Sequence, residues 1–423
     1  MTTLDEDLED AAGGSVLPGV VHPGLRRARA WLSRAVEPGT IDVWRYVEDL
    51  GPVEAVRRLR AGSAPAPIRS LLGARVGQDE SLADLRRAER CEARLVVPED
   101  DEWPGYPLHA LTVALAREPL GREDQSDRTT APVPPLALWV RGPARLDEVS
   151  DRSVAVVGAR ACTAYGEHVA AELGHQLGER GWTVVSGGAY GIDAAAHRGA
   201  LAADMPTVAV LACGVDRVYP AGNGALFARI AETGLLVSEW PPGCAPLRYR
   251  FLVRNRLIAA LTRGTVVVEA AARSGAQATA RRAQKLSRPV LVVPGPVTSA
   301  LSVGCHELLR EREAGAVLVT NAAEVIEAVG GIGTDLAAPA ERPASPRDGL
   351  SDLAARVLDA CPVRRGVSPE RLAAIAGCDV LEVLRVLPVL ELADLVQWTG
   401  TGWRLTPPPA PATPAGAARG VLP

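Results

Sequence analysis

The amino-acid sequence predicts an α/β fold with a doubly wound parallel sheet, set between a helical N-terminal region and a small C-terminal domain. Seven apolar, β-branched runs alternate with amphipathic segments of helical length; they lie at 154–157, 183–185, 207–211, 235–237, 265–269, 289–293 and 316–319. Strands that read as continuous apolar runs are buried on both faces, as in a parallel sheet covered by helices. We therefore predict a Rossmann-like domain over residues 151–330.

The region before the sheet has a helical pattern. From residue 25 to residue 93, apolar residues recur at three- and four-residue spacing, and glycine or proline marks the breaks. This pattern predicts a small helical domain over 25–93, followed by a less regular connecting segment over 94–150. Residues 1–24 are acidic and then rich in glycine and proline, which predicts a disordered N-terminus.

The region after the sheet reads as a separate unit. Residues 331–350 are rich in proline, glycine and alanine, which predicts a linker. Residues 351–406 contain three helical segments, the last of them interrupted by Pro388, and then two short strands around a glycine-containing turn. Three helices and a β-hairpin predict a winged helix-turn-helix. The proline-rich residues 407–423 predict a disordered tail.

Composition excludes several classes of protein. With 423 residues, 47 % apolar and 23 % charged, the chain is expected to form roughly two to three folded units. It has no apolar run of membrane-spanning length, its N-terminus is acidic, and its seven cysteines lack zinc-type spacing. We expect a reduced, cytoplasmic protein with no membrane anchor and no metal site. Lys285 is the only lysine and does not follow a P-loop glycine, so a P-loop ATPase is excluded.

Basic residues are concentrated in one part of an acidic chain. Residues 241–300 contain ten arginines and lysines and a single acid, Glu269, which gives this stretch a net charge of +9. Because the whole chain carries −4, the other residues together carry −13. A local positive field on an acidic protein is typical of a site for a polyanion, although a solvated arginine-rich helix face produces part of the same signal.

Polar or glycine-rich sequences follow the first four predicted strands. They are Gly-Ala-Arg at 158–160, Ser-Gly-Gly-Ala-Tyr-Gly-Ile-Asp at 186–193, Cys-Gly-Val-Asp-Arg-Val-Tyr-Pro at 213–220, and Ser-Glu-Trp-Pro-Pro-Gly at 238–243 before an arginine-rich run at 247–256. In a doubly wound sheet, ligands bind beyond the carboxyl ends of the strands. Glycines there let backbone N–H groups approach an anion at the positive end of a helix.

These residue types predict a site for single-stranded nucleic acid. Arginine side chains donate to phosphate in a fork, and aromatic rings give exposed bases a flat surface on which to stack. The predicted DNA-binding residues are Arg160, Ser186, Gly187, Gly188, Gly191, Tyr249, Phe251, Arg254, Asn255, Arg256 and Lys285. No catalytic residue, metal ligand or cofactor is predicted.

Simpler structural roles remain open for several residues. The 186–193 segment can be a tight turn in which Asp193 caps the following helix. His197, four residues later, can be a local helix partner of Asp193 rather than half of a catalytic pair. Phe251 can begin a core helix, and Glu269 can be a lone buried acid or the partner of an arginine.

Two enzyme classes use a similar glycine-rich turn. A dinucleotide site requires Gly-x-Gly-x-x-Gly after the first strand, and Arg160 occupies the position of a required glycine, so NAD binding is not expected. A nucleotide-cleaving phosphoribohydrolase carries Pro-Gly-Gly-x-Gly-Thr-x-x-Glu, and the 186–193 turn has neither the threonine nor the glutamate. A nucleotide sensor, or such an enzyme with Glu269 as its acid, remains the alternative function.

At these residues the chain resembles the DprA/Smf family of DNA-processing proteins. The matching segments are VVGAR (156–160), SGGAYGIDAAAH (186–197), VLACGVDRVYP (210–220), SEWPPG (238–243), RNRLIAAL (254–261), VVVEAAARSGAQATA (266–280) and VVPGPV (292–297). They cover the predicted sheet region in the order found in the family. The region 25–93 resembles the family's sterile-alpha-motif-like domain, and 351–406 resembles its winged helix.

The resemblance implies a role without catalysis. Members of the family bind incoming single-stranded DNA during natural transformation, protect it, dimerise through the Rossmann-like domain and help load the RecA recombinase. By this resemblance, the DNA contacts are Arg160, Phe251, Arg254, Arg256 and the turn formed by Ser186, Gly187 and Gly188. The expected partners are single-stranded DNA, RecA and a second copy of the chain.

The chain departs from the family pattern at the expected rim of the site. Residues 275–280 read GAQATA where GSLITA is usual, His306 replaces an expected asparagine, and 310–314 is longer than usual. The predicted recognition helix of the winged helix, 379–387, contains two acids and one arginine. Such a helix is poorly suited to a phosphate-lined groove, so a protein-contact or dimer-stabilising role is favoured for this domain.

Overall fold

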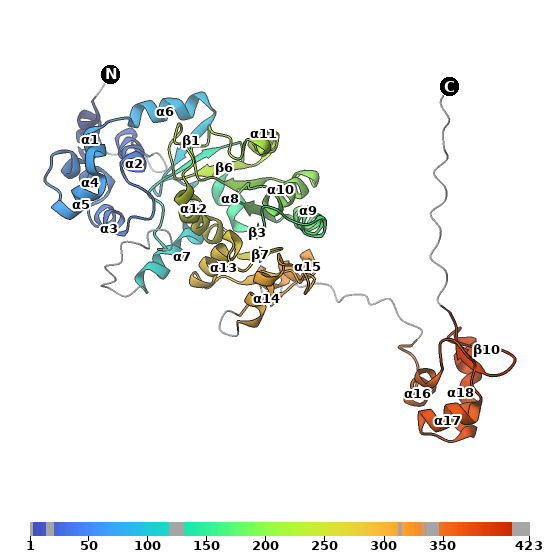
Figure 1. The fold of residues 1–423 in the computed structure, drawn as a ribbon. Coiled ribbons are helices and arrows are strands. Elements are labelled where there is room, and N and C mark those ends of the chain that lie inside the picture. The colour runs from blue at the N-terminus through green and yellow to red at the C-terminus, as the bar shows by residue number, and fades with distance from the viewer. Residues whose placement is uncertain are drawn as a thin grey trace, which may run out of the picture. The chain divides into compact units, whose positions relative to one another are not determined.

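The chain forms two compact units, Met1–Ala338 and Pro339–Pro423 (Figure 1). The computed structural model describes residues 3–13, 21–117, 131–311, 315–331, 335 and 347–407. Most of the predicted linker, nearly all of the predicted C-terminal tail and residues 312–314 lie outside this part of the chain. None of the helices in the described ranges is long and apolar enough to cross a membrane.

A nine-stranded sheet forms the centre of the first unit. The strands are β1 (Ala93–Val96), β2 (Leu138–Arg141), β3 (Ser153–Val157), β4 (Thr183–Ser186), β5 (Thr207–Val210), β6 (Leu235–Ser238), β7 (Gly264–Val267), β8 (Val290–Val292) and β9 (Val317–Leu318). Their spatial order is β1-β2-β6-β5-β4-β3-β7-β8-β9. The seven strands β3 to β9 are parallel to one another, and β2 is antiparallel to both of its neighbours, β1 and β6. All seven predicted strands are present, which confirms the Rossmann-like fold.

Helices cover both faces of this sheet (Figure 1). One face packs against α9 (Ala164–Glu179), α10 (Ile192–Ala202) and α15 (Ala322–Val329). The other packs against α7 (Gly105–Ala116), α8 (Leu146–Asp151), α12 (Arg248–Ala260), α13 (Gly275–Lys285) and α14 (Val303–Arg310). The short η3 (Ala221–Asn223) precedes α11 (Gly224–Thr233), which packs near β5 and β6.

The order of the parallel strands reverses beside β3. From β3 the chain builds outward through β4, β5 and β6, and it then returns to place β7 on the other side of β3. Such a reversal separates the loops above the two neighbouring strands, and a crevice forms at their carboxyl ends. The topology therefore places the ligand site between β3 and β7.

The N-terminal helical region has its own apolar core in this unit. Its helices are α1 (Leu4–Gly13), α2 (Pro23–Ala35), α3 (Ile41–Leu50), α4 (Pro52–Arg60), α5 (Ala66–Leu72), η1 (Gly73–Gly77) and α6 (Ser81–Arg90). Helix α1 lies where the sequence predicts disorder, and that prediction is wrong for residues 4–13. Leu4 and Leu8 are each 1 % exposed in the core with Trp31, so packing stabilises a helix that its acidic composition does not favour.

The second unit contains three helices and a β-hairpin, as predicted for a winged helix. They are α16 (Asp352–Ala360), α17 (Pro369–Ala376), α18 (Val380–Leu392), β10 (Val396–Trp398) and β11 (Trp403–Leu405). The predicted interruption at Pro388 is wrong, because α18 continues through this residue. Its neighbours Leu387 and Leu390 are both buried in the core of the unit, and this packing outweighs the backbone hydrogen bond that proline removes.

Helices α9 and α10 pack with their backbones in close contact. A Cβ atom at Gly199 in α10 would overlap the carbonyl oxygen of Ala171 in α9. We expect Gly199→Ala to lower the free energy of unfolding by about 1–3 kcal/mol, because a backbone atom cannot move aside as a side chain does. Urea unfolding measures this effect. Gly77→Ala is the control, since a Cβ there meets no heavy atom within 4 Å; equal losses in both variants would contradict the expectation.

Candidate nucleic-acid interface

A pocket of about 330 Å³ lies at the reversal between β3 and β7. The turn after β3, the first half of α12 and the start of α13 form its wall. Four predicted site residues, Arg160, Phe251, Arg254 and Asn255, line it. Residues about ninety positions apart in the sequence thus meet in one site because β3 and β7 are neighbours in the sheet.

Arg160 and two aromatic rings form a stack beside this pocket, which we call the Arg160–Phe251–Tyr219 stack. The guanidinium carbon of Arg160 lies 5.5 Å from the centre of the Phe251 ring. The rings of Phe251 and Tyr219 have centroids 5.3 Å apart and are inclined at 49°. Arg160 is exposed and has no ion-pair partner within the described part of the chain. A cation at this distance is attracted to a ring face and stays available to a ligand anion.

Tyr190 and Tyr219 are not among the predicted site residues. Tyr219 is 44 % exposed and Tyr190 is 48 % exposed, and the Tyr190 hydroxyl accepts a hydrogen bond from the backbone N–H of Gly222 at 3.1 Å. With Tyr165 after β3 and Tyr249 after β6, four of the six tyrosines in the chain follow carboxyl ends of parallel strands. This recurrence of an aromatic residue after successive strands is the sequence signal that identifies them.

The glycine-rich turn after β4 is occupied by a carboxylate of the protein itself. Asp193 accepts hydrogen bonds from the backbone N–H groups of Gly187 at 3.1 Å and Ala189 at 3.4 Å. Burial raises the pKa of Asp193, and the positive charge of Arg254 opposes this shift. The Gly187 amide is therefore engaged within the protein in this structure, and its contact with phosphate stays a prediction. The turn is tight, as the simpler interpretation held, but Asp193 closes it from within instead of capping the helix.

The other predicted residues of this turn have packing roles. Ser186 is buried, and its hydroxyl donates to the carbonyl oxygen of Val156 at 2.6 Å. Gly188 is also buried, has a φ of +65° and leaves no room for a Cβ beside the Phe227 ring. Both residues are buried in this structure, and their DNA contacts stay predictions. Gly191 is partly exposed, and a DNA contact there stays a prediction.

Arg254 joins the turn after β4 to β5. Its guanidinium donates to the carbonyl oxygens of Gly187, at 3.0 Å, and of Val210, and its Nε atom donates to Asn255 Oδ1 at 3.2 Å. Burial lowers the pKa of Arg254 to about 10, so the side chain remains charged at neutral pH. Asn255 in turn donates to the carbonyl oxygen of Gly275 at 3.4 Å. Both residues border the pocket, and their first role is to hold its wall together.

Arg256, Lys285 and Tyr249 are not part of the pocket. Arg256 is 2 % exposed, and its two terminal nitrogens donate to Glu239 at 2.6 and 2.7 Å. Both terminal nitrogens of Arg256 are thus paired with Glu239 inside the protein, and its phosphate contact stays a prediction. Lys285 ends α13, roughly 15 Å along the helix from the residue that begins it at the pocket. Tyr249 is exposed on the first turn of α12, outside the pocket lining.

Acids from other parts of the chain balance much of the charge on residues 241–300. Ion pairs join Arg250 to Glu37, Arg256 to Glu239, Arg263 to Asp151 and Arg281 to Glu311. Near the pocket, Arg248 begins α12 and Arg273 precedes α13, and both are exposed without an ion-pair partner among the residues described. The positive field at this edge therefore comes from Arg160, Arg248 and Arg273 more than from the predicted arginines of α12.

Glu269 and His197 are both engaged in structural contacts. Glu269 accepts from the hydroxyl of Thr163 at 2.6 Å and from its backbone N–H at 2.9 Å, at the start of α9. The Nδ1 atom of His197 lies 2.8 Å from the Thr207 hydroxyl, which itself donates to a carbonyl oxygen, so Nδ1 is the donor. Neither residue lines the pocket. This placement gives no support to the alternative function with Glu269 as a catalytic acid.

Burial of His197 should make stability depend on pH. Burial lowers its pKa from 6.5 to about 3, so in that window the unfolded chain binds a proton that the folded chain does not. Stability is then lost as the pH falls from about 6.5 toward 3, by at most about 1.4 kcal/mol per pH unit. Urea unfolding between pH 7 and pH 4.5 measures this slope. His197→Asn keeps a donor for Thr207 and cannot gain the proton, so its slope should be shallower; an unchanged slope would contradict the assignment.

Comparison with known proteins identifies relatives that match between about half and nine-tenths of the chain. Residues 123–330 match a family model described as DNA recombination-mediator protein A. A putative DNA processing protein DprA of Mycobacterium tuberculosis is 48 % identical over 380 residues, which are 90 % of this chain and 94 % of that protein. The DNA processing protein DprA of Streptococcus pneumoniae is 42 % identical over 192 residues, 45 % of this chain and 66 % of that protein.

A solved structure has the same fold. The X-ray structure of DNA processing protein A from Streptococcus pneumoniae matches with a TM-score of 0.57 and 29 % sequence identity. The match covers 72 % of this chain and 96 % of the solved one. Sequence and fold therefore point to the same group of relatives.

Proposed function

Because the chain belongs to the DprA/Smf family of DNA-processing proteins, we propose that it binds single-stranded DNA and mediates recombination. The observation that carries this proposal is the Arg160–Phe251–Tyr219 stack beside the pocket between β3 and β7. It combines an exposed cation with ring faces, which is the combination that single-stranded nucleic acid requires. A duplex keeps its bases paired and stacked, so it cannot use those ring faces.

The strand runs over the carboxyl edge of the parallel sheet. Its phosphates contact Arg160 and the two exposed arginines at the starts of α12 and α13, Arg248 and Arg273. A base stacks on Phe251, and Tyr190 and Tyr219 offer further ring faces to neighbouring bases. The support for this path is that all these side chains follow strand ends at one edge of the sheet.

The finer parts of the role rest on family membership. We propose that the chain protects incoming DNA in natural transformation, helps load the RecA recombinase and acts as a homodimer through its Rossmann-like domain. A role without catalysis is proposed as well, since Glu269 and His197 are held by structural partners. The winged helix is proposed to contact protein instead of DNA.

Arg160→Ala tests the electrostatic part of this proposal. The variant should bind an oligo-dT strand more weakly by about 1–2 kcal/mol, and its log–log salt dependence should be flatter by roughly 0.7, the value for one phosphate contact. Fluorescence anisotropy at several salt concentrations measures both quantities. Arg263→Ala is the control, because Arg263 pairs with Asp151 at the opposite edge of the sheet. Wild-type affinity and slope in Arg160→Ala would reject the proposed contact.

Phe251→Ala tests the stacking part. Loss of the ring should lower affinity for the same strand by about 1–3 kcal/mol and leave the salt dependence unchanged, because no phosphate contact is removed. Tyr106→Ala provides the control, since Tyr106 is 84 % exposed and adjoins Pro107, whose carbonyl accepts from Arg288 near the start of β8. A variant that binds like wild type, or wild-type protein that prefers a duplex of equal length, would refute base stacking at this site.

A further inference from the structure

The N-terminal helical region reaches the first turn of α12, which carries Phe251. Glu37 follows α2, and its carboxylate accepts hydrogen bonds from Trp240 Nε1 at 2.9 Å and from Arg250 Nε and Nη2 at 2.9 and 3.1 Å. Arg75 lies 3.6 Å from the same carboxylate. One acid thus joins the helical region to the loop before α12 and to the residue next to Phe251 in the chain.

Trp240 and Phe251 belong to the same apolar cluster. Trp240 is 2 % exposed and is buried with Ala212 and Val253, and Phe251 packs against this group. The guanidinium carbon of Arg250 lies 5.2 Å from the centre of the Trp240 ring. One of the donors to Glu37, Trp240, thus belongs to the cluster against which Phe251 packs, and the other, Arg250, lies over the Trp240 ring.

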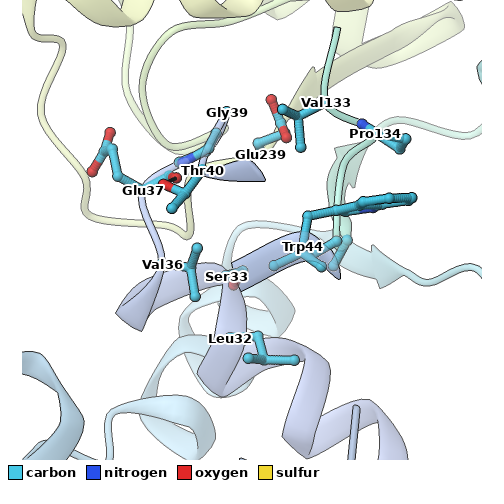
Figure 2. Close-up of a pocket in the computed structure, with 13 residues that line it drawn as sticks. Leu32, Ser33, Val36, Glu37, Gly39, Thr40, Trp44, Val133, Pro134 and Glu239 are labelled. Carbon is cyan, nitrogen blue, oxygen red and sulfur yellow. Dashed lines mark hydrogen bonds between the residues drawn. The ribbon is translucent and has the colours of Figure 1, made fainter. Parts of the chain in front are cut away.

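The junction around Glu37 has no room for a ligand. Figure 2 shows Glu37 and Glu239 at one small pocket between the helical region and the sheet, with the Glu37 carboxylate turned away from its centre. The pocket measures about 20 Å³, which is enough for about one water molecule. Both acids engage arginines of α12, Arg250 and Arg256. The contact around Glu37 therefore holds the helical region against α12 and is not a binding site.

We propose that Glu37 is a positioning residue for the DNA-binding surface and that it acts by holding Trp240 and Arg250, and through them Phe251. The inference rests on the proposed function, because it needs Phe251 to contact DNA. It makes the helical region part of the DNA-binding machinery, although the region contributes no DNA contact through this residue.

The direction in which Glu37→Gln changes the affinity for DNA distinguishes a positioning role of Glu37 from a purely electrostatic one. A carboxylate near a polyanion repels it, and removal of Glu37 also frees Arg250 to contact a phosphate. Charge alone therefore predicts that Glu37→Gln binds single-stranded DNA more tightly and with a steeper salt dependence. Positioning predicts weaker binding with an unchanged salt dependence, because what is lost is the placement of a stacking ring.

The experiment measures oligo-dT binding by the full chain and its variants over a series of salt concentrations. We expect Glu37→Gln to lower affinity about fivefold, the low end of a lost base stack, at the wild-type salt slope. Glu99→Gln is the matched control: Glu99 pairs with the buried Arg29 at 2.6 Å, and among the residues described no hydrogen bond or ion pair joins it to α12, so the affinity of this variant should stay at the wild-type value. Unchanged or tighter binding by Glu37→Gln, or an equal loss in Glu99→Gln, would overturn the proposal.

Two further variants show whether Glu37 acts through its partners. Trp240→Phe removes the indole N–H together with the five-membered ring and keeps a six-membered aromatic ring in the cluster, and it should weaken binding in the same way without a change in slope. In an Arg250→Gln background, Glu37→Gln should add less to the loss than it does alone. Wild-type affinity in Trp240→Phe, or fully additive losses, would contradict this route.

The wild-type protein distinguishes the two proposals. If it fails to bind the strand, the proposed function itself is wrong. If it binds the strand and only the variants give results other than those expected, the positioning role alone is wrong.

Discussion

Two buried charges at the carboxyl edge of the sheet determine what this surface can bind. Asp193 takes the backbone N–H groups of the glycine-rich turn, and Arg254 takes the carbonyl oxygens of Gly187 and Val210. Together they satisfy polar groups that, in a nucleotide-binding turn, would face a phosphate. The polar groups of the turn are thus engaged within the protein, and we propose that a ligand is recognised by side chains around the turn. The exposed Arg160 and its aromatic neighbours are the groups left to meet a ligand.

The balance between charge and stacking follows from this arrangement. Several arginines that make residues 241–300 strongly basic form ion pairs with acids outside this stretch, Glu37 and Glu239 among them. The exposed cations near the pocket are few, whereas exposed rings follow several neighbouring strands. Affinity for a single strand should therefore depend on base stacking at least as much as on phosphate contacts.

Local patterns in the sequence predict the fold well, and the candidate site only in part. Buried parallel strands read as apolar runs, so the sheet and the meeting of Arg160 with Phe251 follow from the sequence. The ion pair of Arg256 with Glu239 cannot be predicted in this way, because net charge does not show that an acid seventeen residues earlier lies beside the arginine. Helix α1 and the passage of α18 through Pro388 depend on tertiary packing, which overrides local composition. The tyrosines after β4 and β5 repeat after successive strands, but the glycines beside them are the stronger indication of a ligand site, so the tyrosines are not among the predicted residues.

The close contact between α9 and α10 has a consequence for binding. These helices begin just after the turn that holds Arg160 and just after the turn that Asp193 closes, so their direct backbone contact keeps the two turns at a fixed separation. A surface preorganised in this way loses little conformational freedom when a ligand arrives. If the chain binds a polynucleotide as proposed, most of the conformational entropy lost on binding is then lost by the polynucleotide. We therefore expect tighter binding to a strand that is already extended or has no secondary structure.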